Sequence, residues 1–156
     1  MNIFYLSTDP ILAAQYQCNK HVVKMILETA QLLSSAHHIL DGQNDSLYKL
    51  THKNHPCAIW TRSNKSNYHW LYLHFVALLE EYSFRYNKIH ATSRLLELLS
   101  NAPKNILEGE FYDPPKCMQE EYKLENCVDS YRNYYMKAKK DFAKWIKREV
   151  PTWYEP

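Results

Sequence analysis

The sequence predicts a mainly α fold: a single compact helical domain with a short N-terminal extended segment and long ordered loops. Glycine is scarce, with 2 residues in a chain of 156, whereas average usage would give about eleven. Because tight β-hairpin turns favour glycine, an all-β fold is disfavoured. Apolar side chains also recur at helical spacing over long stretches. One domain covering residues 1–156 fits the length, since domains typically hold about 100–200 residues.

The N-terminal part is expected to hold an extended segment followed by helix. Residues 2–6 are β-prone and predict a short strand or an extended arm packed on the core. Ser7-Thr8-Asp9-Pro10 is typical of a helix start, with a capping side chain followed by proline in the first turn. A helical pattern then runs from Ile11 to Leu40, and a break near Cys18-Asn19 would divide it into two helices. Gly42 follows, where a C-terminal glycine is expected.

The middle of the chain is expected to alternate loops with helices. Residues 41–56 are polar and irregular, and a helical turn is expected over Cys57–Arg62. The strongest helical pattern covers Asn67–Tyr86, where aromatic and apolar side chains recur every three or four positions. A further helix is expected over Ala91–Ser100.

The C-terminal third is expected to begin with a long ordered excursion over residues 101–125, which contains Pro103, Pro114 and Pro115. Ordered loops of this length are often functional. A last helix is expected over Val128–Arg148, ended by Pro151.

Charge and motifs exclude several classes of function. The net charge of +2 permits nucleic-acid binding without indicating a long basic track. The few glycines leave no phosphate-binding loop of the dinucleotide or Walker type. The four cysteines form no C-x-x-C pair, so no zinc knuckle is indicated, and the sequence specifies no cofactor.

No signal peptide or transmembrane segment is recognisable. The first ten residues lack a basic region followed by an apolar run, and no apolar run reaches about 18 residues. We therefore expect a cytoplasmic protein, in the host cell cytoplasm if phage-encoded, with free thiols and no membrane partner. The sequence does not indicate the oligomeric state.

A narrow polar stripe runs along the otherwise apolar helical pattern of residues 20–38. Its members are Lys20, Lys24, Glu28 and Gln31, with His21 beside them. One interpretation is a solvated helix face with a Lys24–Glu28 pair at i,i+4. The other is the floor of a cleft, where lysines hold phosphate and an ionised carboxylate stabilises a cation or acts as a base.

The segment THKNHPCAIWTR, residues 51–62, concentrates polar side chains before and after Pro56. It can present imidazole, amide, indole and guanidinium groups to a ligand, with indole suited to base stacking and guanidinium to phosphate. These candidate ligand-binding residues are His52, Asn54, His55, Trp60 and Arg62. The alternative is a capped turn with a core tryptophan. Metal binding by the two histidines would need a third ligand that the spacing does not specify.

Arg132 lies in a Tyr-rich and lysine-rich segment, Tyr131–Lys144. Interleaved aromatic and basic residues suit a nucleic-acid backbone. A solvated basic face over a tyrosine core is the alternative.

Two resemblances can be stated. The stretches MNIF, KHVVKMILETAQ, THKNHPCAIW, YRNYY and PTW resemble a group of small phage-type proteins of poorly defined function. The order of elements and the Pro151-Thr152-Trp153-Tyr154 tail are similar to the pyrimidine-dimer DNA glycosylases of the phage endonuclease V type. That resemblance implies a small helical protein acting on DNA, with an N-terminal amine as nucleophile and a glutamate on the first long helix. The register offers Lys20-His21 or, one turn on, Glu28 at the position of the family's Arg-Glu pair.

We therefore expect a nucleic-acid-acting enzyme, a DNA glycosylase-like protein that excises or modifies a base, with DNA favoured as partner. Glu28, His55 and His21 are the expected catalytic residues. The expected substrate-binding residues are Lys20, Lys24, Gln31, His52, Asn54, Trp60, Arg62 and Arg132. Two alternatives remain: an enzyme or binder for a free nucleotide, and a non-enzymatic phage accessory protein that binds a host partner.

Overall fold

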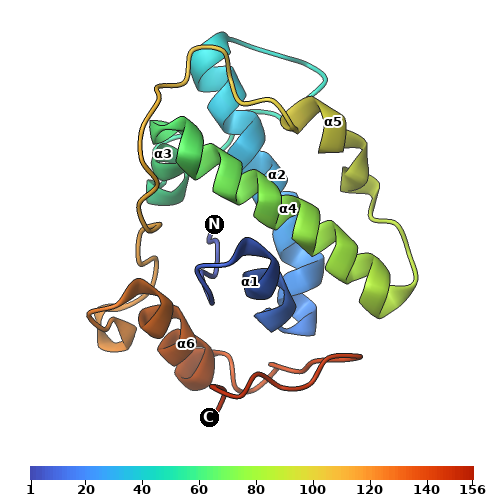
Figure 1. The fold of residues 1–156 in the computed structure, drawn as a ribbon, viewed down its shortest axis with the longest axis vertical. Coiled ribbons are helices and arrows are strands. Elements are labelled where there is room, and N and C mark those ends of the chain that lie inside the picture. Colours follow the sequence, from blue (N-terminus) through green and yellow to red (C-terminus); the bar gives the residue numbers. More distant parts are fainter.

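The structure is a computed structural model that describes residues 1–156, and it contains α-helices and short 3₁₀ turns but no β-strand (Figure 1). The predicted mainly α fold is confirmed. The helices are α1 (Pro10–Tyr16), α2 (Asn19–Asp41), α3 (Pro56–Ser63), α4 (Lys65–Tyr86), α5 (Leu96–Leu99) and α6 (Cys127–Ala138), with 3₁₀ turns η1 (Ala91–Leu95) and η2 (Glu120–Tyr122).

The predicted break between the first two helices is confirmed at Gln17 and Cys18, which both have extended backbone. The break leaves backbone groups that another part of the chain must satisfy. The Cys18 N–H donates to the Tyr135 hydroxyl at 3.2 Å, and the Asn19 N–H donates to the Lys144 carbonyl at 2.8 Å. The C-terminal segment therefore supplies the hydrogen-bond partners that stabilise the break between α1 and α2.

Helix ends follow the capping residues of the sequence. The Asp9 side chain accepts a hydrogen bond from the Ile11 N–H, and Asn64 caps α4 in the same way through the Asn67 N–H. Gly42 ends α2 at φ 93°, a backbone conformation that favours glycine. The helix expected over Ala91–Ser100 is present as η1 followed by α5.

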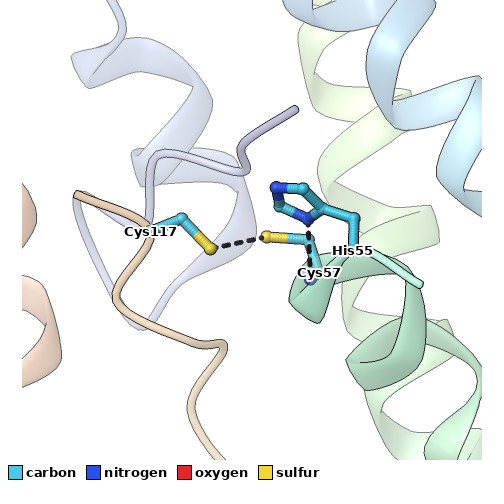
Figure 2. A group of neighbouring side chains, drawn as sticks. All are labelled: His55, Cys57 and Cys117. Atoms are coloured by element: carbon cyan, nitrogen blue, oxygen red, sulfur yellow. Dashed lines mark hydrogen bonds between the residues drawn. The ribbon is translucent and has the colours of Figure 1, made fainter. Parts of the chain in front are cut away.

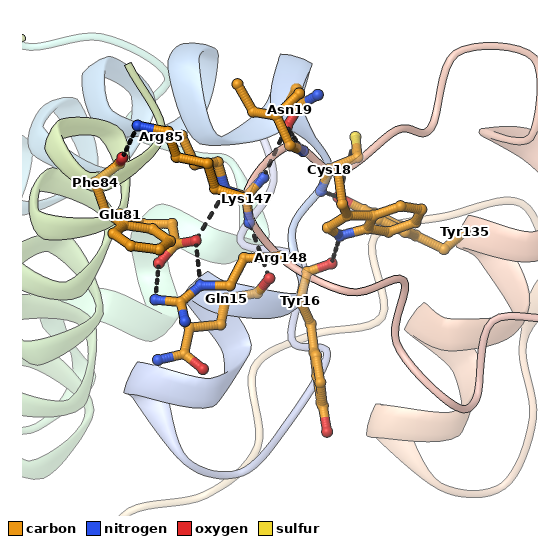
Figure 3. A network of polar contacts seen from close by, with 12 residues as sticks. Gln15, Tyr16, Cys18, Asn19, Glu81, Phe84, Arg85, Tyr135, Lys147 and Arg148 are labelled. Carbon is orange, nitrogen blue, oxygen red and sulfur yellow. Dashed lines mark hydrogen bonds and ion pairs between the residues drawn. The ribbon is translucent and has the colours of Figure 1, made fainter. Parts of the chain in front are cut away.

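The last helix is a correction, because α6 ends at Ala138 rather than at Arg148. Residues beyond it pack instead on the junction of α1 and α2 (Figure 3). The Trp145 indole N–H donates to the Tyr16 carbonyl at 2.9 Å, and the Ile146 N–H donates to Asn19 Oδ1 at 3.0 Å. A continued helix would satisfy its own backbone and could not supply these partners, so tertiary contacts override the helical pattern.

Residues 2–6 form an extended, fully buried arm without a strand partner, as one of the two alternatives predicted. The arm bends at Phe4, whose φ of 58° is rare for a bulky side chain. The Phe4 ring stacks on His21 with 4.1 Å between ring centroids. The Gln17 side chain donates to the Ile3 carbonyl at 3.2 Å. These contacts hold the bend, which directs Met1 towards α2.

The core lies between α2, α4 and α1, and α4 crosses α2 in Figure 1. It is rich in tyrosine, and several of the buried hydroxyls bond to backbone carbonyls. Tyr68 donates to the Leu99 carbonyl at 2.7 Å, and Tyr131 donates to the Pro115 carbonyl at 2.7 Å. None of the helices is both long enough and apolar enough to cross a membrane.

A buried ion cluster ties α4 to the C-terminal tail and to the α1–α2 junction (Figure 3). Glu81 Oε1 accepts hydrogen bonds from Arg85 Nε at 2.8 Å and from Arg148 Nε at 2.9 Å. The Arg85 guanidinium also donates to Asn19 Oδ1 and to the Gln15 carbonyl. Arg85 is therefore paired and hydrogen-bonded on all sides, as a buried charge requires.

Acid is expected to destabilise the protein through two buried histidines. Burial lowers the pKa of His21 to about 3, with Lys139 and Lys24 adding to the effect, and burial lowers the pKa of His74 to about 4. The unfolded chain binds these protons from about pH 6.5 downwards, whereas the folded chain does not. The free energy of unfolding should therefore have its full value above pH 6.5. It should fall by about 2 kcal/mol for each histidine when the pH is lowered to 5. Urea unfolding at several pH values measures this.

His74→Asn is the matched control for this prediction. The His74 ring bonds to the Pro10 carbonyl at 3.0 Å, and an amide can still donate there without titrating. The variant should lose about half of the dependence on pH between 5 and 6.5. An unchanged slope would show that other groups cause the acid sensitivity.

Candidate active site

The backbone amine of Met1 meets the carboxylate of Glu28 inside the protein. The Met1 nitrogen lies 3.4 Å from Glu28 Oε1, and the two side chains are only 3% and 14% exposed. Lys24 Nζ lies 3.6 Å from the other carboxylate oxygen, Oε2, on the solvent side of the helix. Glu28 Oε2 is buried and accepts no hydrogen bond. The carboxylate therefore has one oxygen near the Met1 amine and the other near the Lys24 ammonium, at ion-pair distance from each.

Asn2 fixes the amine in this place. Its side-chain oxygen accepts from the Ile3 N–H at 2.8 Å, and its amide nitrogen donates to the Cys117 carbonyl at 2.9 Å. These bonds connect the first residues of the chain to the loop between α5 and α6. The bonds of Asn2 and the contact with Glu28 together hold Met1 in place.

His55 borders the same site from the start of α3. Its Nδ1 accepts the Cys57 N–H at 3.0 Å and so caps the helix. Burial lowers the pKa of His55, and the Met1 ammonium and His52 lower it further, while Glu28 acts in the opposite direction. The charges of Glu28 and His55 thus act on each other, and the shared catalytic role expected for these two residues stays a prediction.

Positive charge lies along the exposed side of α2. Lys20 and Lys24 are exposed on this helix, and Lys20 Nζ lies 4.9 Å from the centre of the Phe142 ring. Lys139 lies over Tyr134 at 4.7 Å and also acts on the charge of His21. Lys20 and Lys139 both lie over the Phe142 ring, and of the three lysines Lys24 pairs with Glu28.

The opposite side of the site is the loop before α3. His52 and Asn54 are exposed there. The loop is closed by Arg62, which donates to the Lys53 carbonyl at 2.7 Å, and it is attached to α2 by Ser35, which donates to the Thr51 carbonyl. Arg62 therefore shapes the loop.

A cavity of about 850 Å³ opens next to this loop, along the later turns of α2. Gln31 lies one turn beyond Glu28 and lines it, together with Tyr48 and Thr51. Its size is in the range of small-ligand pockets.

Three expected site residues lie elsewhere. Trp60 is only 2% exposed and its indole N–H donates to the Tyr112 carbonyl, so it is the core tryptophan of the alternative interpretation and cannot stack on a base. His21 is enclosed by aromatic rings and bonded to the Tyr135 hydroxyl. Arg132 donates to the Leu6 carbonyl at 3.0 Å and stacks over Trp153. All three stabilise the fold around the arm.

The residues expected from the sequence did not include two features of the site. The Met1 amine is a backbone group that no residue pattern marks, although the family resemblance pointed to it. Cys57 and Cys117 lie beside His55 and come from segments sixty residues apart, with 3.4 Å between their sulfur atoms. Only the folded chain brings them together.

Comparison with known proteins gives one match. A family model described as pyrimidine dimer DNA glycosylase matches residues 1–94. The matched part includes α1 to α4, and with them Met1, Glu28 and His55. No curated protein and no solved structure matches the chain.

Proposed function

Because the chain belongs to the pyrimidine dimer DNA glycosylase family, we propose that it excises a damaged pyrimidine from DNA, with the Met1 amine as nucleophile and Glu28 as the assisting carboxylate. The family assignment supports a DNA glycosylase-like function. The 3.4 Å contact between the amine and Glu28 Oε1 carries the assignment of the residues.

The amine attacks C1′ of the target deoxyribose, and the bond from C1′ to the pyrimidine breaks with its electron pair leaving on the base. The ring bond from C1′ to O4′ then opens as a C1′–N double bond forms, and the two protons that the amine loses end on the released base and on O4′, the latter passed on by Glu28. Glu28 Oε1 accepts a proton from the amine, and the carboxylate stabilises the positive charge that develops on the sugar.

The surroundings of the pair suit a DNA strand. Lys20, Lys24 and Lys139 offer phosphate contacts on one side, while His52 and Asn54 offer hydrogen bonds on the other. An enzyme that acts on C1′ must take the nucleotide out of the stack. The cavity lined by Gln31 begins one turn beyond Glu28, and the Gln31 amide can bond to the edge of an extruded base there.

Borohydride is expected to trap the protein on DNA that contains a pyrimidine dimer. Reduction converts the imine between Met1 and C1′ into a stable amine, so one chain should become linked to one DNA strand. Gel electrophoresis detects the product, and peptide mass spectrometry should locate the link on Met1.

The matched control is the same protein with Gly-Ser added before Met1. The addition moves the amine out of the buried contact with Glu28 and keeps every side chain. Trapping should fall below detection while the circular dichroism spectrum stays the same. Full trapping by the extended protein, or a link on a lysine, would contradict the assignment of the nucleophile.

A further inference from the structure

His55, Cys57 and Cys117 form a cluster of metal-binding side chains (Figure 2). Their ligand atoms all lie within 4.8 Å of one another. His55 and Cys57 stand at the start of α3, and Cys117 faces them from the loop that runs between α5 and α6.

We propose that His55, Cys57 and Cys117 bind one zinc ion. Zinc takes tetrahedral sites with Zn–S bonds of about 2.3 Å, which places two sulfur ligands about 3.8 Å apart. The two sulfur atoms here are 3.4 Å apart, well beyond a disulfide bond of about 2.05 Å. A small adjustment of either side chain therefore completes two corners of a tetrahedron.

The donor atoms select the cation. Two thiolates and one imidazole are soft and borderline ligands, which suit zinc, whereas magnesium and calcium require oxygen. Three protein ligands leave the fourth position to water. Loss of two thiol protons balances the charge of the ion, so the bound cluster is neutral.

His55 contributes Nδ1. This nitrogen accepts the Cys57 N–H, so in the neutral ring Nε2 carries the proton and Nδ1 carries the free electron pair. Binding of zinc through Nδ1 replaces the helix-capping bond with a metal bond.

The ion would fasten the loop of residues 101–125 to the part of the protein that the family model matches. Cys117 is already fixed by its neighbours, since its carbonyl accepts from the Asn2 side chain and its N–H donates to Tyr131. A metal bond at its sulfur would add a third attachment next to the first residue of the chain. Zinc therefore stabilises the part of the loop around Cys117 that contacts the N-terminal arm.

The test measures zinc in the full-length protein, kept reduced with a phosphine. The metal-stripped protein should bind one equivalent of zinc with a dissociation constant below about 1 µM. Cobalt in place of zinc should give the near-ultraviolet charge-transfer absorption of thiolate ligands and the visible bands of a tetrahedral ion. Zinc should also raise the melting temperature, and none of these measurements depends on glycosylase activity.

Cys117→Ser and Cys57→Ser should each weaken zinc binding at least tenfold and reduce the cobalt charge-transfer band. Cys127→Ser is the matched control, because Cys127 is a free cysteine bonded to the Pro114 carbonyl outside the cluster. It should bind zinc as the wild type does. Failure of the wild-type protein to bind zinc, or full binding by both serine variants, would overturn the proposal even if borohydride trapping succeeds.

Discussion

Replacing Glu28 with glutamine should lower the rate of base excision by about 10²–10⁴-fold, the usual range for loss of a positioned acid–base group. The amide keeps the size of the side chain and can still contact the Met1 amine. It can neither accept a proton nor carry the charge that balances a cationic sugar. Single-turnover kinetics on a duplex with one pyrimidine dimer measures the excision step itself.

Lys24→Met is the matched control, since it removes the other partner of Glu28 and leaves the carboxylate. It should mainly weaken DNA binding, with a smaller dependence of affinity on salt, because one phosphate contact is lost. Excision at saturating protein should change little. If Glu28→Gln excised bases at the wild-type rate, the active site would not lie at the contact between Met1 and Glu28. That result would favour the alternative in which this region binds a partner protein.

Replacing Glu81 with glutamine should lower the free energy of unfolding by about 3–5 kcal/mol, because removing one member of a buried ion pair leaves the other charge unpaired. Glu81 is 3% exposed and Arg85 is 2% exposed. Arg148 donates to both carboxylate oxygens, which raises the pKa of its guanidinium. Urea unfolding followed by circular dichroism gives the change in stability.

Glu120→Gln is the comparison for this effect. Glu120 pairs with Lys123, but its side chain is 87% exposed. Exposed pairs contribute little, so the variant should unfold at nearly the wild-type urea concentration. Equal effects of the two replacements would mean that the Glu81 cluster does not hold the tail in place.

The helices could be predicted from the sequence where the pattern is local. The aromatic and apolar spacing of residues 67–86 marks a buried helix, and Asp9, Gly42 and Asn64 mark helix ends. The end of α6 could not be predicted, because the partners of Trp145 and Ile146 lie at the α1–α2 junction, more than a hundred residues away along the chain.

The site could be predicted in part. The polar stripe on α2 drew attention to Glu28, and both the Lys24–Glu28 pair that the spacing predicts and a contact with the Met1 amine are present. A high density of polar residues did not show which side chains are at the surface and which stabilise the fold. His52 and Asn54 are exposed, whereas the polar groups of Trp60 and Arg132 donate hydrogen bonds to backbone carbonyls. The approach of Met1 depends on the bend at Phe4, a backbone conformation that side-chain spacing does not encode.

The C-terminal tail also bears on where one evolutionary unit ends and another begins. The family match stops at residue 94, but the fold does not divide there. Tyr135 bonds to Cys18, Arg132 bonds to Leu6, and Arg148 completes the ion cluster of Glu81. Residues after position 94 therefore supply hydrogen-bond and ion-pair partners to the matched region. We therefore expect that residues 1–94 would not fold as an autonomous module. Any exchange of segments between such proteins would have to move the tail together with the helices it closes.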